Sequence, residues 1–221
     1  MYRYLKWRGV DDERIDDYGI GYCVSGEFAG YIVFPYYQGG LPVYFTTRAV
    51  LTATGKKTLN PEADRRWYLY NYDRAIRNKH IILVEGPLDA VCVGRAAIAI
   101  GGKVLLDEQL DLLDRDHVTE ITVVLDSDAH RETEMVCAKL VNRLPGKRIT
   151  YVLLKDGDPA DHAADFHDLL DDRVEMGFGR VVHMKMAQTR MDRHDEEYPE
   201  DTPIDFQDRI RAKLYAEAID E

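Results

Sequence analysis

The feature that most constrains the fold is an alternation of short apolar runs with helical segments from His80 onward. The apolar runs cover residues 81–84, 97–100, 121–125 and 149–154, and helical patterns cover 87–93, 105–113, 133–144 and 161–170. Short apolar runs that alternate with helices and short loops are typical of a parallel sheet buried on both faces. The sequence therefore predicts an α/β domain in which helices flank a parallel sheet.

Acidic residues follow three of these four predicted strands. Glu85 follows the first strand, the pair Asp126 and Asp128 follows the third, and Asp156, Asp158 and Asp161 follow the fourth. Parallel sheets place ligand sites at the carboxyl ends of their strands. Converging carboxylates repel one another and are tolerated mainly where a hard divalent cation neutralises them. A single Asp after a strand is often an ordinary cap, and a lone Asp-x-Asp also occurs in phosphotransfer and phosphatase domains. Three acidic clusters after strands of one sheet are much harder to explain in this way, and together they favour a Mg²⁺ or Mn²⁺ site.

The chain before His80 has a different pattern, that of a small α+β lobe. Residues 4–7 predict a short helix that ends at Gly9, and Asp11 is placed to cap a second helical turn. The β-rich runs 18–24, 31–37 and 43–47 are separated by glycines and a proline, which predicts an antiparallel meander. Residues 67–76 predict an aromatic-rich helix.

The chain divides into three expected segments: a lobe over 1–78, an α/β domain over 79–172 and an acidic extension over 173–221. Within the extension, residues 177–186 predict one more strand, 190–203 a solvated linker and 206–219 a helix. The extension from Asp192 onward holds eleven acidic and four basic residues. It predicts either a solvated flank or a segment that docks onto a partner.

The charge of the chain is unevenly distributed. The 221 residues include 29 Lys and Arg against 40 Asp and Glu, a formal net charge of −11. That sum argues against a protein that binds nucleic acid over its whole surface. The segment 47–80 is the exception, because it holds eight basic and three acidic residues. A limited basic surface of this kind predicts weak, salt-sensitive binding of nucleic acid.

Cysteine usage and hydropathy set the expected compartment. Cys23, Cys92 and Cys137 are far apart and odd in number, with no CxxC pair, so we expect no zinc site and no disulfide framework. No apolar run approaches the roughly 20 residues that span a bilayer, and the first residues lack the apolar region of a signal peptide. We therefore expect a cytoplasmic protein with no membrane partner.

Several motifs, in a consistent order, resemble one known family. The segments EGPLDA at 85–90, DSD at 126–128 and DPAD at 158–161 resemble the Toprim domain, which DnaG-type primases, topoisomerases and some nucleases share. The placement of Asp89 four residues after Glu85 is similar to the primase branch. Upstream, YLKWRG at 4–9, IVFPYY at 32–37 and KTLNPE at 57–62 are similar to segments of the primase catalytic core. The resemblance runs from Tyr4 to about Leu170.

The resemblance implies a DnaG-type DNA primase catalytic core, which makes short RNA primers on single-stranded DNA by metal-dependent nucleotidyl transfer. It implies Glu85, Asp126 and Asp128 as catalytic residues. It assigns the metal, Mg²⁺ or Mn²⁺, to Glu85, Asp89, Asp126, Asp128 and Asp158. Arg48 and Lys57 match basic residues that hold template or nucleotide phosphate, and Arg65 and Arg66 stand where the family often has a second lysine.

The same resemblance sets expectations for domains and partners. Residues 1–78 match the primase N-terminal lobe and 79–172 the Toprim domain. Single-stranded DNA and nucleoside triphosphates are the expected ligands. A zinc module and a helicase region are not expected, since there is no CxxC pair and only about fifty residues follow the Toprim part. We therefore expect a stand-alone, phage- or plasmid-type core that relies on a replicative helicase or a separate template-recognition protein.

Three other functions remain open at this point. A Toprim nuclease would use the same acids to cut rather than join, but such nucleases lack the N-terminal lobe. A topoisomerase needs a further domain to present its tyrosine. A non-catalytic replication accessory protein would have no use for clustered carboxylates. Template-dependent synthesis that is lost when Asp126 or Asp128 is neutralised distinguishes the primase from all three.

Overall fold

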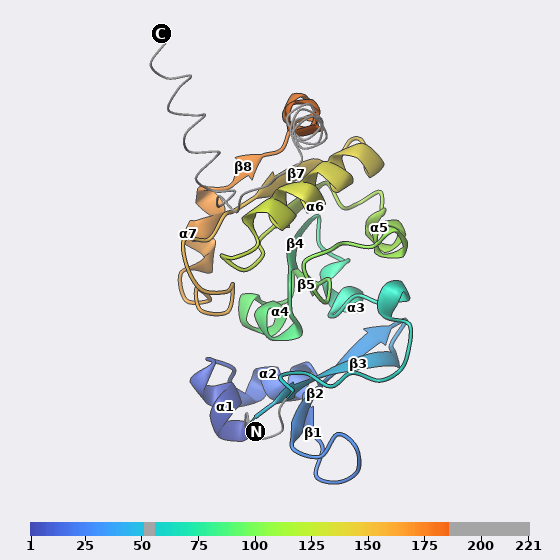
Figure 1. Ribbon diagram of the computed structural model, residues 1–221, viewed down its shortest axis with the longest axis vertical. Helices are drawn as coiled ribbons and strands as arrows, with labels where there is room; N and C mark the ends of the chain where they lie inside the picture. The colour runs from blue at the N-terminus through green and yellow to red at the C-terminus, as the bar shows by residue number, and fades with distance from the viewer. Residues whose placement is uncertain (51–55, 186–221) are drawn as a thin grey trace, which may run out of the picture. The chain divides into compact units, whose positions relative to one another are not determined.

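The computed structural model describes residues 1–50 and 56–185 (Figure 1). The chain forms two compact units, Met1–Phe178 and Gly179–Glu221. Both sheets belong to the first unit, and the finer boundaries at 78/79 and 172/173 stay predictions. The predicted linker at 190–203 and helix at 206–219 lie outside the described residues. Within the described part of the chain, no helix has the length and apolar character needed to cross a membrane.

The N-terminal lobe joins two short helices to a three-stranded antiparallel sheet, as the sequence predicts. Its elements are α1 (Tyr2–Trp7), α2 (Asp12–Asp17), β1 (Gly21–Tyr22), β2 (Tyr31–Gln38) and β3 (Leu41–Ala49), with sheet order β1-β2-β3. Asp11 caps α2 as expected, because its Oδ1 accepts a hydrogen bond of 2.8 Å from the amide of Arg14. The first strand is shorter than the predicted 18–24, since Tyr18 still belongs to the C-cap of α2.

The segment that connects the lobe to the parallel sheet corrects the prediction of a helix over 67–76. A 3₁₀ turn, η2 (Arg65–Trp67), is followed by extended chain and by the single-turn helix α3 (Tyr72–Ala75). Tyr70 pairs with Ala99 through two backbone hydrogen bonds of 3.1 and 3.3 Å. Asn71 has a left-handed backbone, with φ of 60°, which separates this bridge from α3. A long-range backbone pairing has replaced the helix that the aromatic spacing predicted.

The C-terminal part of the first unit is the predicted α/β fold. Its elements are β4 (His80–Val84), α4 (Pro87–Val93), β5 (Ala97–Ala99), α5 (Asp107–Leu113), β6 (Glu120–Val123), α6 (His130–Arg143), β7 (Arg148–Tyr151), α7 (Phe166–Asp171) and β8 (Val174–Glu175). The sheet order is β5-β4-β6-β7-β8, and the first four strands are parallel. β8 pairs antiparallel with β7 and has only two residues, both exposed, so no apolar run announces it.

The predicted strand over 177–186 is wrong. The backbone of 178–185 is helical, and residue 186 lies outside the described residues.

The order of the strands creates a switch point beside β4. The chain leaves β4 for β5 on one side and then crosses to β6 on the other side. Loops that follow strands on either side of such a point diverge and leave a crevice at the carboxyl edge, where α/β proteins place their ligands. Glu85 follows β4 and Asp126 lies shortly after β6, so both residues lie at the position where such a crevice is expected, which is called the carboxylate crevice below.

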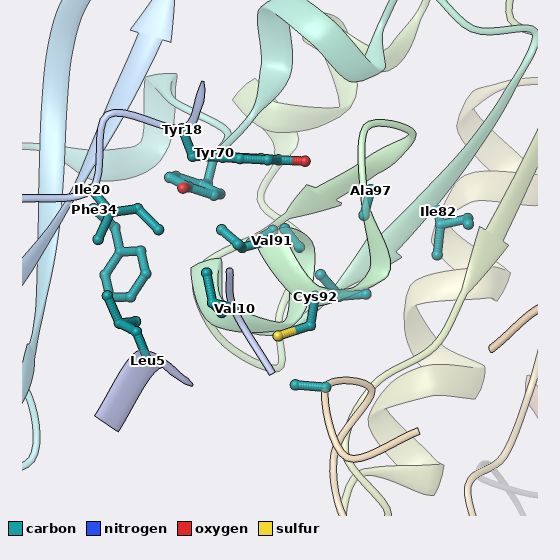
Figure 2. Packing of buried hydrophobic residues seen from close by; sticks show 14 of the residues in the cluster. Leu5, Val10, Tyr18, Ile20, Phe34, Tyr70, Ile82, Val91, Cys92 and Ala97 are labelled. Carbon is teal, nitrogen blue, oxygen red and sulfur yellow. The ribbon is translucent and has the colours of Figure 1, made fainter. Parts of the chain in front are cut away.

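The N-terminal lobe packs against α4 through a shared core (Figure 2). Val10, Ile20 and Phe34 of the lobe belong to the same buried cluster as Val91 and Cys92 of α4. Burial of apolar surface of this kind is the main stabilising contribution in folding. The cluster holds the lobe next to the carboxyl edge of the parallel sheet, so residues of the lobe can reach the crevice.

Candidate active site

Backbone hydrogen bonds join four loops in two pairs at the carboxyl edge of the parallel sheet. The amide of Gly101 donates to the carbonyl of Glu85 at 2.9 Å, which joins the loops after β5 and β4. The amide of Ser127 donates to the carbonyl of Gly157 at 3.0 Å, which joins the loops after β6 and β7. The acidic residues that the sequence placed after these strands are therefore held along one edge.

Within residues 1–50 and 56–185, Glu85 and Asp126 are the two carboxylates with a buried oxygen that lacks a hydrogen-bond partner. Glu85 Oε2 and Asp126 Oδ1 are buried, and neither has a hydrogen-bond partner among the described residues. Burial raises the pKa of both groups, and neighbouring negative charge adds to it: Asp126 acts on Glu85, and Asp158 acts on Asp126. A buried polar atom without a partner is costly, so these two oxygens mark a place that favours an external cation or donor.

Asp89 is the most deeply buried of the predicted metal ligands. It lies in the first turn of α4, is 7% exposed, and its Oδ2 accepts a hydrogen bond of 2.9 Å from the amide of Gly86. Burial, followed by the charges of Asp158 and Asp126, raises the pKa of Asp89 to about 7. At neutral pH this carboxyl group therefore holds a proton far more readily than an exposed aspartate does.

Asp128 differs from these groups because the protein itself supplies a cation. Lys103 Nζ lies 2.8 Å from Asp128 Oδ1, and the Asp128 side chain is 74% exposed. The hydrogen bond from Lys103 lowers the pKa of Asp128. Lys103 was not among the residues expected at this site, although its place directly after Gly101 and Gly102, at the carboxyl end of a strand, was an available signal.

Asp158 is held by an arginine from the N-terminal lobe. Arg8 Nη2 lies 2.7 Å from both carboxylate oxygens of Asp158, and Arg8 Nη1 lies 3.4 Å from Asp161 Oδ1. The Arg8 side chain is only 12% exposed. Arg8 was expected only as part of a motif. Its pairing with Asp158 was not expected from the sequence, because the two residues are 150 positions apart in the chain.

The predicted phosphate-binding residues Arg48 and Lys57 are brought to the same part of the lobe. The Thr47 hydroxyl donates to the carbonyl of Leu59 and accepts from its amide, and the amide of Ala49 donates to the carbonyl of Lys57 at 2.9 Å. The segment that carries Lys57 is therefore attached to β3, beside Arg48. The charge of Lys57 opposes the rise in the pKa of Glu85 and of Asp126, so its ammonium group acts on the carboxylate crevice.

Arg65 and Arg66 already have partners within the protein. Arg65 donates to the carbonyl of Gly101, and a side chain at Gly101 would place its Cβ 2.7 Å from Arg65 Nη1. Gly101 also has a positive φ of 78°, so its backbone favours glycine, whereas the contact with Arg65 involves only the mobile end of that side chain. Arg66 pairs with Asp64 at 2.6 Å and with Glu108 at 3.4 Å. The predicted contact of these two arginines with nucleic acid stays a prediction.

The carboxylates at this edge of the sheet suit a metal ion that needs few protein ligands. Among residues 1–50 and 56–185, no group of three or more His, Cys, Asp and Glu side chains forms a ready cage for a metal ion. Mg²⁺ does not need one, because it commonly takes one or two carboxylates and completes its shell with water and substrate phosphates. The two bare carboxylate oxygens of Glu85 and Asp126 suit this mode of binding.

Comparison with known proteins identifies the fold. The chain matches the structure of the Aquifex aeolicus primase zinc-binding and RNA polymerase domains, with a TM-score of 0.69 and 18% sequence identity. It also matches the RNA polymerase domain of Mycobacterium tuberculosis primase DnaG (TM-score 0.66, 21% identity) and the primase fragment of the bacteriophage T7 primase-helicase (TM-score 0.56, 18% identity). The fold is thus that of a primase RNA polymerase domain.

The extent of these matches limits what they show. The chain is covered to 79%, 78% and 74% in the three comparisons, and it spans 56% of the Aquifex chain, 75% of the Mycobacterium chain and 70% of the T7 chain. No family model matches the sequence. No curated protein matches it either. The likeness therefore lies in the fold, and the activity has to be argued from the site.

Proposed function

We propose that this protein is a DNA primase catalytic core, which joins nucleoside triphosphates into short RNA primers on a single-stranded DNA template. The observation that carries the proposal is the pair of bare, half-buried carboxylates, Glu85 and Asp126, at the switch point of a primase-like fold. Carboxylates in this state favour a divalent cation, and nucleotidyl transfer to a primer end is a reaction that such cations support.

Glu85 and Asp126 would hold Mg²⁺ or Mn²⁺, with Asp89, Asp128 and Asp158 as further candidate ligands in the Toprim-type assignment. When bound there, the metal supplies a Lewis acid that neutralises charge developing on phosphate oxygens. Asp158 is the candidate least available to a cation, because Arg8 already binds both of its oxygens. Asp128 is available once Lys103 moves to another anion.

Other side chains near the crevice would bind the nucleotide and the template and accept a proton. Lys103 lies at the exposed mouth beside Asp128, where its ammonium can pass from this carboxylate to the phosphates of an incoming triphosphate. Lys57 and Arg48 lie along β3 and would bind the template backbone. The raised pKa of Glu85 brings this group closer to neutral pH, so it is suited to receive the proton of the primer hydroxyl.

Two similar structures that contain nucleic acid support the partners that we propose. The Mycobacterium RNA polymerase domain was also solved in complex with a double-stranded DNA oligomer with a 6-nucleotide overhang. The T7 primase domains were seen bound to an RNA/DNA hybrid together with the lagging-strand DNA polymerase. For this chain we propose single-stranded DNA as the template, and a replicative helicase or a separate template-recognition protein as the partner that brings it.

The alternative is a metal-dependent nuclease that uses the same carboxylates. The N-terminal lobe favours the primase, because it shares a core with α4 and directs Arg8 to the crevice. A nuclease needs no surface that holds a growing primer beside a template. The basic surface formed by Arg48 on β3 and by Lys57, whose segment is hydrogen-bonded to β3, would serve this purpose in a primase.

The deciding experiment incubates the protein with single-stranded DNA templates, labelled ribonucleotides and Mg²⁺ or Mn²⁺. We expect template-dependent oligomers from the unmodified protein and none from Asp126→Asn. Asp116→Asn is the matched control, since Asp116 is exposed in the loop before β6, at the amino end of that strand. Cleavage of the template without synthesis, lost in Asp126→Asn, would reject the primase in favour of the nuclease.

A further inference from the structure

Asp158 and Asp161 form a closed turn in the loop that follows β7. The amide of Asp161 donates to Asp158 Oδ1 at 3.0 Å, and the amide of Asp158 donates to Asp161 Oδ2 at 3.2 Å. The carbonyl of Gly157, at the start of this turn, accepts a hydrogen bond of 3.0 Å from the amide of Ser127. The turn is therefore joined to the loop that carries Asp126.

A single guanidinium group, that of Arg8, contacts both carboxylates of this turn. Arg8 Nη2 lies 2.7 Å from each oxygen of Asp158, and Arg8 Nη1 lies 3.4 Å from Asp161 Oδ1. Asp158 Oδ1 thus has two donors, the guanidinium and the amide of Asp161, and Asp158 Oδ2 has one. A metal ion that bound Asp158 would have to displace the guanidinium and leave a buried charge without its partner, which is costly.

Contacts with α1 and α4 hold Arg8 in this position. Its amide donates to the carbonyl of Tyr4 at 3.0 Å, and its carbonyl accepts a hydrogen bond of 3.4 Å from Cys92 Sγ on α4. Its guanidinium carbon lies 6.0 Å from the centroid of the Trp7 ring. Because the side chain is also largely buried, Arg8 lacks the freedom to move aside that an exposed side chain has.

The turn requires a cation because it lies among other carboxylates. Burial raises the pKa of Asp89 and of Asp126, and the charge of Asp158 is the next largest cause in both. The charge of Arg8 opposes this rise at Asp89. A cation beside Asp158 therefore relieves repulsion within the carboxylate crevice, and the N-terminal lobe supplies this cation.

The second ion pair of the crevice differs from this one. Lys103 contacts Asp128 at 2.8 Å, but the lysine side chain is about one third exposed and the aspartate side chain is mostly exposed. Exposed pairs of this kind are exchanged for contacts with water at little cost. Asp128 can therefore pass to a metal ion, whereas Asp158 stays bound to Arg8.

We propose that Arg8 is a permanent cation of the active site and takes the place that a second divalent ion would fill. Glu85 and Asp126 hold one ion, to which Asp128 can add a ligand. Asp158 is not a metal ligand, and its pair with Arg8 positions the loop. Arginine is always charged, so it serves at any metal concentration. This assignment rests on the proposed function, since it requires a metal ion at Glu85 and Asp126.

Titration of the full chain with Mn²⁺, without nucleotide, tests the number of ions through the electron paramagnetic resonance signal of free Mn²⁺. We expect one ion per chain. Asp126→Asn should weaken binding at least tenfold because it removes a ligand, and Asp158→Asn should weaken it no more than about threefold because it changes only a nearby charge. A tenfold or larger loss in Asp158→Asn, or two ions per unmodified chain, would overturn the proposal and leave the proposed function standing.

The same titration separates this failure from that of the proposed function. If the unmodified protein bound no Mn²⁺ at millimolar concentration, the metal site at Glu85 and Asp126 would be rejected, and the role of Arg8 with it.

Variants of Arg8 test the substitution itself. Arg8→Gln should bind a second Mn²⁺ ion, because the carboxylates of Asp158 and Asp161 lose their cation. The double variant Arg8→Gln/Asp158→Asn should bind one ion again, and Arg8→Lys, which keeps the positive charge, should also bind one. Arg3→Gln, at an exposed site on α1, is the matched control.

Thermal melting of each variant shows that it is folded before the titration. One ion per chain in folded Arg8→Gln, or two in the double variant, would overturn the proposal. The Asp158→Asn measurement decides independently of whether Arg8→Gln folds, since Asp158→Asn leaves Arg8 in place.

Discussion

The carboxylates at the edge of the parallel sheet fall into two groups that the protein treats differently. Asp128 and Asp158 each have a cation from the protein, Lys103 at 2.8 Å and Arg8 at 2.7 Å. Glu85 and Asp126 each keep a buried oxygen without any partner among the described residues. All four lie after strands of one sheet, so their positions in the sequence do not distinguish them.

The difference shows where an external cation is needed. A carboxylate that is paired with arginine or lysine is already neutralised, and a divalent ion must compete for it. A half-buried carboxylate without a partner bears a desolvation cost that no ion pair offsets, so it gains most when a cation binds. A divalent cation would relieve this cost at Glu85 and Asp126, so these two residues should contribute most to metal affinity.

The largest expected effect tests this division directly. Asp126→Asn removes a bare carboxylate and should lower the rate of primer synthesis by at least about 100-fold, which corresponds to roughly 3 kcal/mol of lost transition-state stabilisation. Asp128→Asn removes a paired one and should cost about tenfold less. Template-directed synthesis by both variants gives the comparison, and equal losses would show that the pairing of Asp128 with Lys103 has no bearing on catalysis.

The second prediction concerns pH and Asp89. Because the folded-state pKa of about 7 lies above the usual value, protonated Asp89 contributes stability that is complete below about pH 4 and is lost as the pH rises through 7. Asp89→Asn avoids this loss, so it should be more stable than the unmodified protein by about 1–3 kcal/mol at pH 8.

Urea unfolding of both proteins without metal, between pH 4.5 and pH 8, measures this effect. The advantage of Asp89→Asn should shrink steadily toward acid pH, where the unmodified protein carries the proton. A difference that does not change with pH would mean that Asp89 titrates normally.

The third prediction weakens one of the pairs. Arg8→Gln leaves Asp158 without the guanidinium that contacts both of its oxygens and should lower the free energy of unfolding by about 1–3 kcal/mol. Arg8→Lys keeps the charge but loses the fork geometry, so a smaller loss is expected. Denaturant unfolding of both variants measures the difference. A cycle with Asp158→Asn isolates the pair, and a coupling energy near zero would show that Arg8 stabilises the lobe by other contacts.

The smallest expected effect concerns the mouth of the crevice. Lys103→Gln should raise KM for the nucleoside triphosphate by about three- to tenfold and leave the fold intact, since exposed pairs contribute little to stability. Steady-state kinetics with Lys79→Gln, a second exposed lysine, as the control measures this change. A fall in kcat at unchanged KM would contradict a role of Lys103 in binding phosphate.

Much of this architecture could be predicted from the sequence because it is local. The apolar runs at 81–84 and 121–125 specify buried strands, and Asp11 caps α2 through a residue three positions along the chain. The prediction failed at Tyr70, whose place in the chain favoured a helix but whose backbone pairs with Ala99, and at the exposed strand β8. Tyr70 depends on a partner that is distant along the chain. The strand β8 forms by pairing at the edge of the sheet and has no apolar pattern of its own.

The sequence by itself determined which acids stand at the ends of strands, because the position of a strand is encoded in the period of its own residues. Only the tertiary structure decided which of them are neutralised, because Arg8 and Asp158 are 150 residues apart and no local pattern links them. The same holds for the open cavity beside Tyr18 and Asn71, which is lined by residues of α2, β2, α3 and the loop before β5. Contacts between elements depend on packing, and packing is a property of the folded chain as a whole.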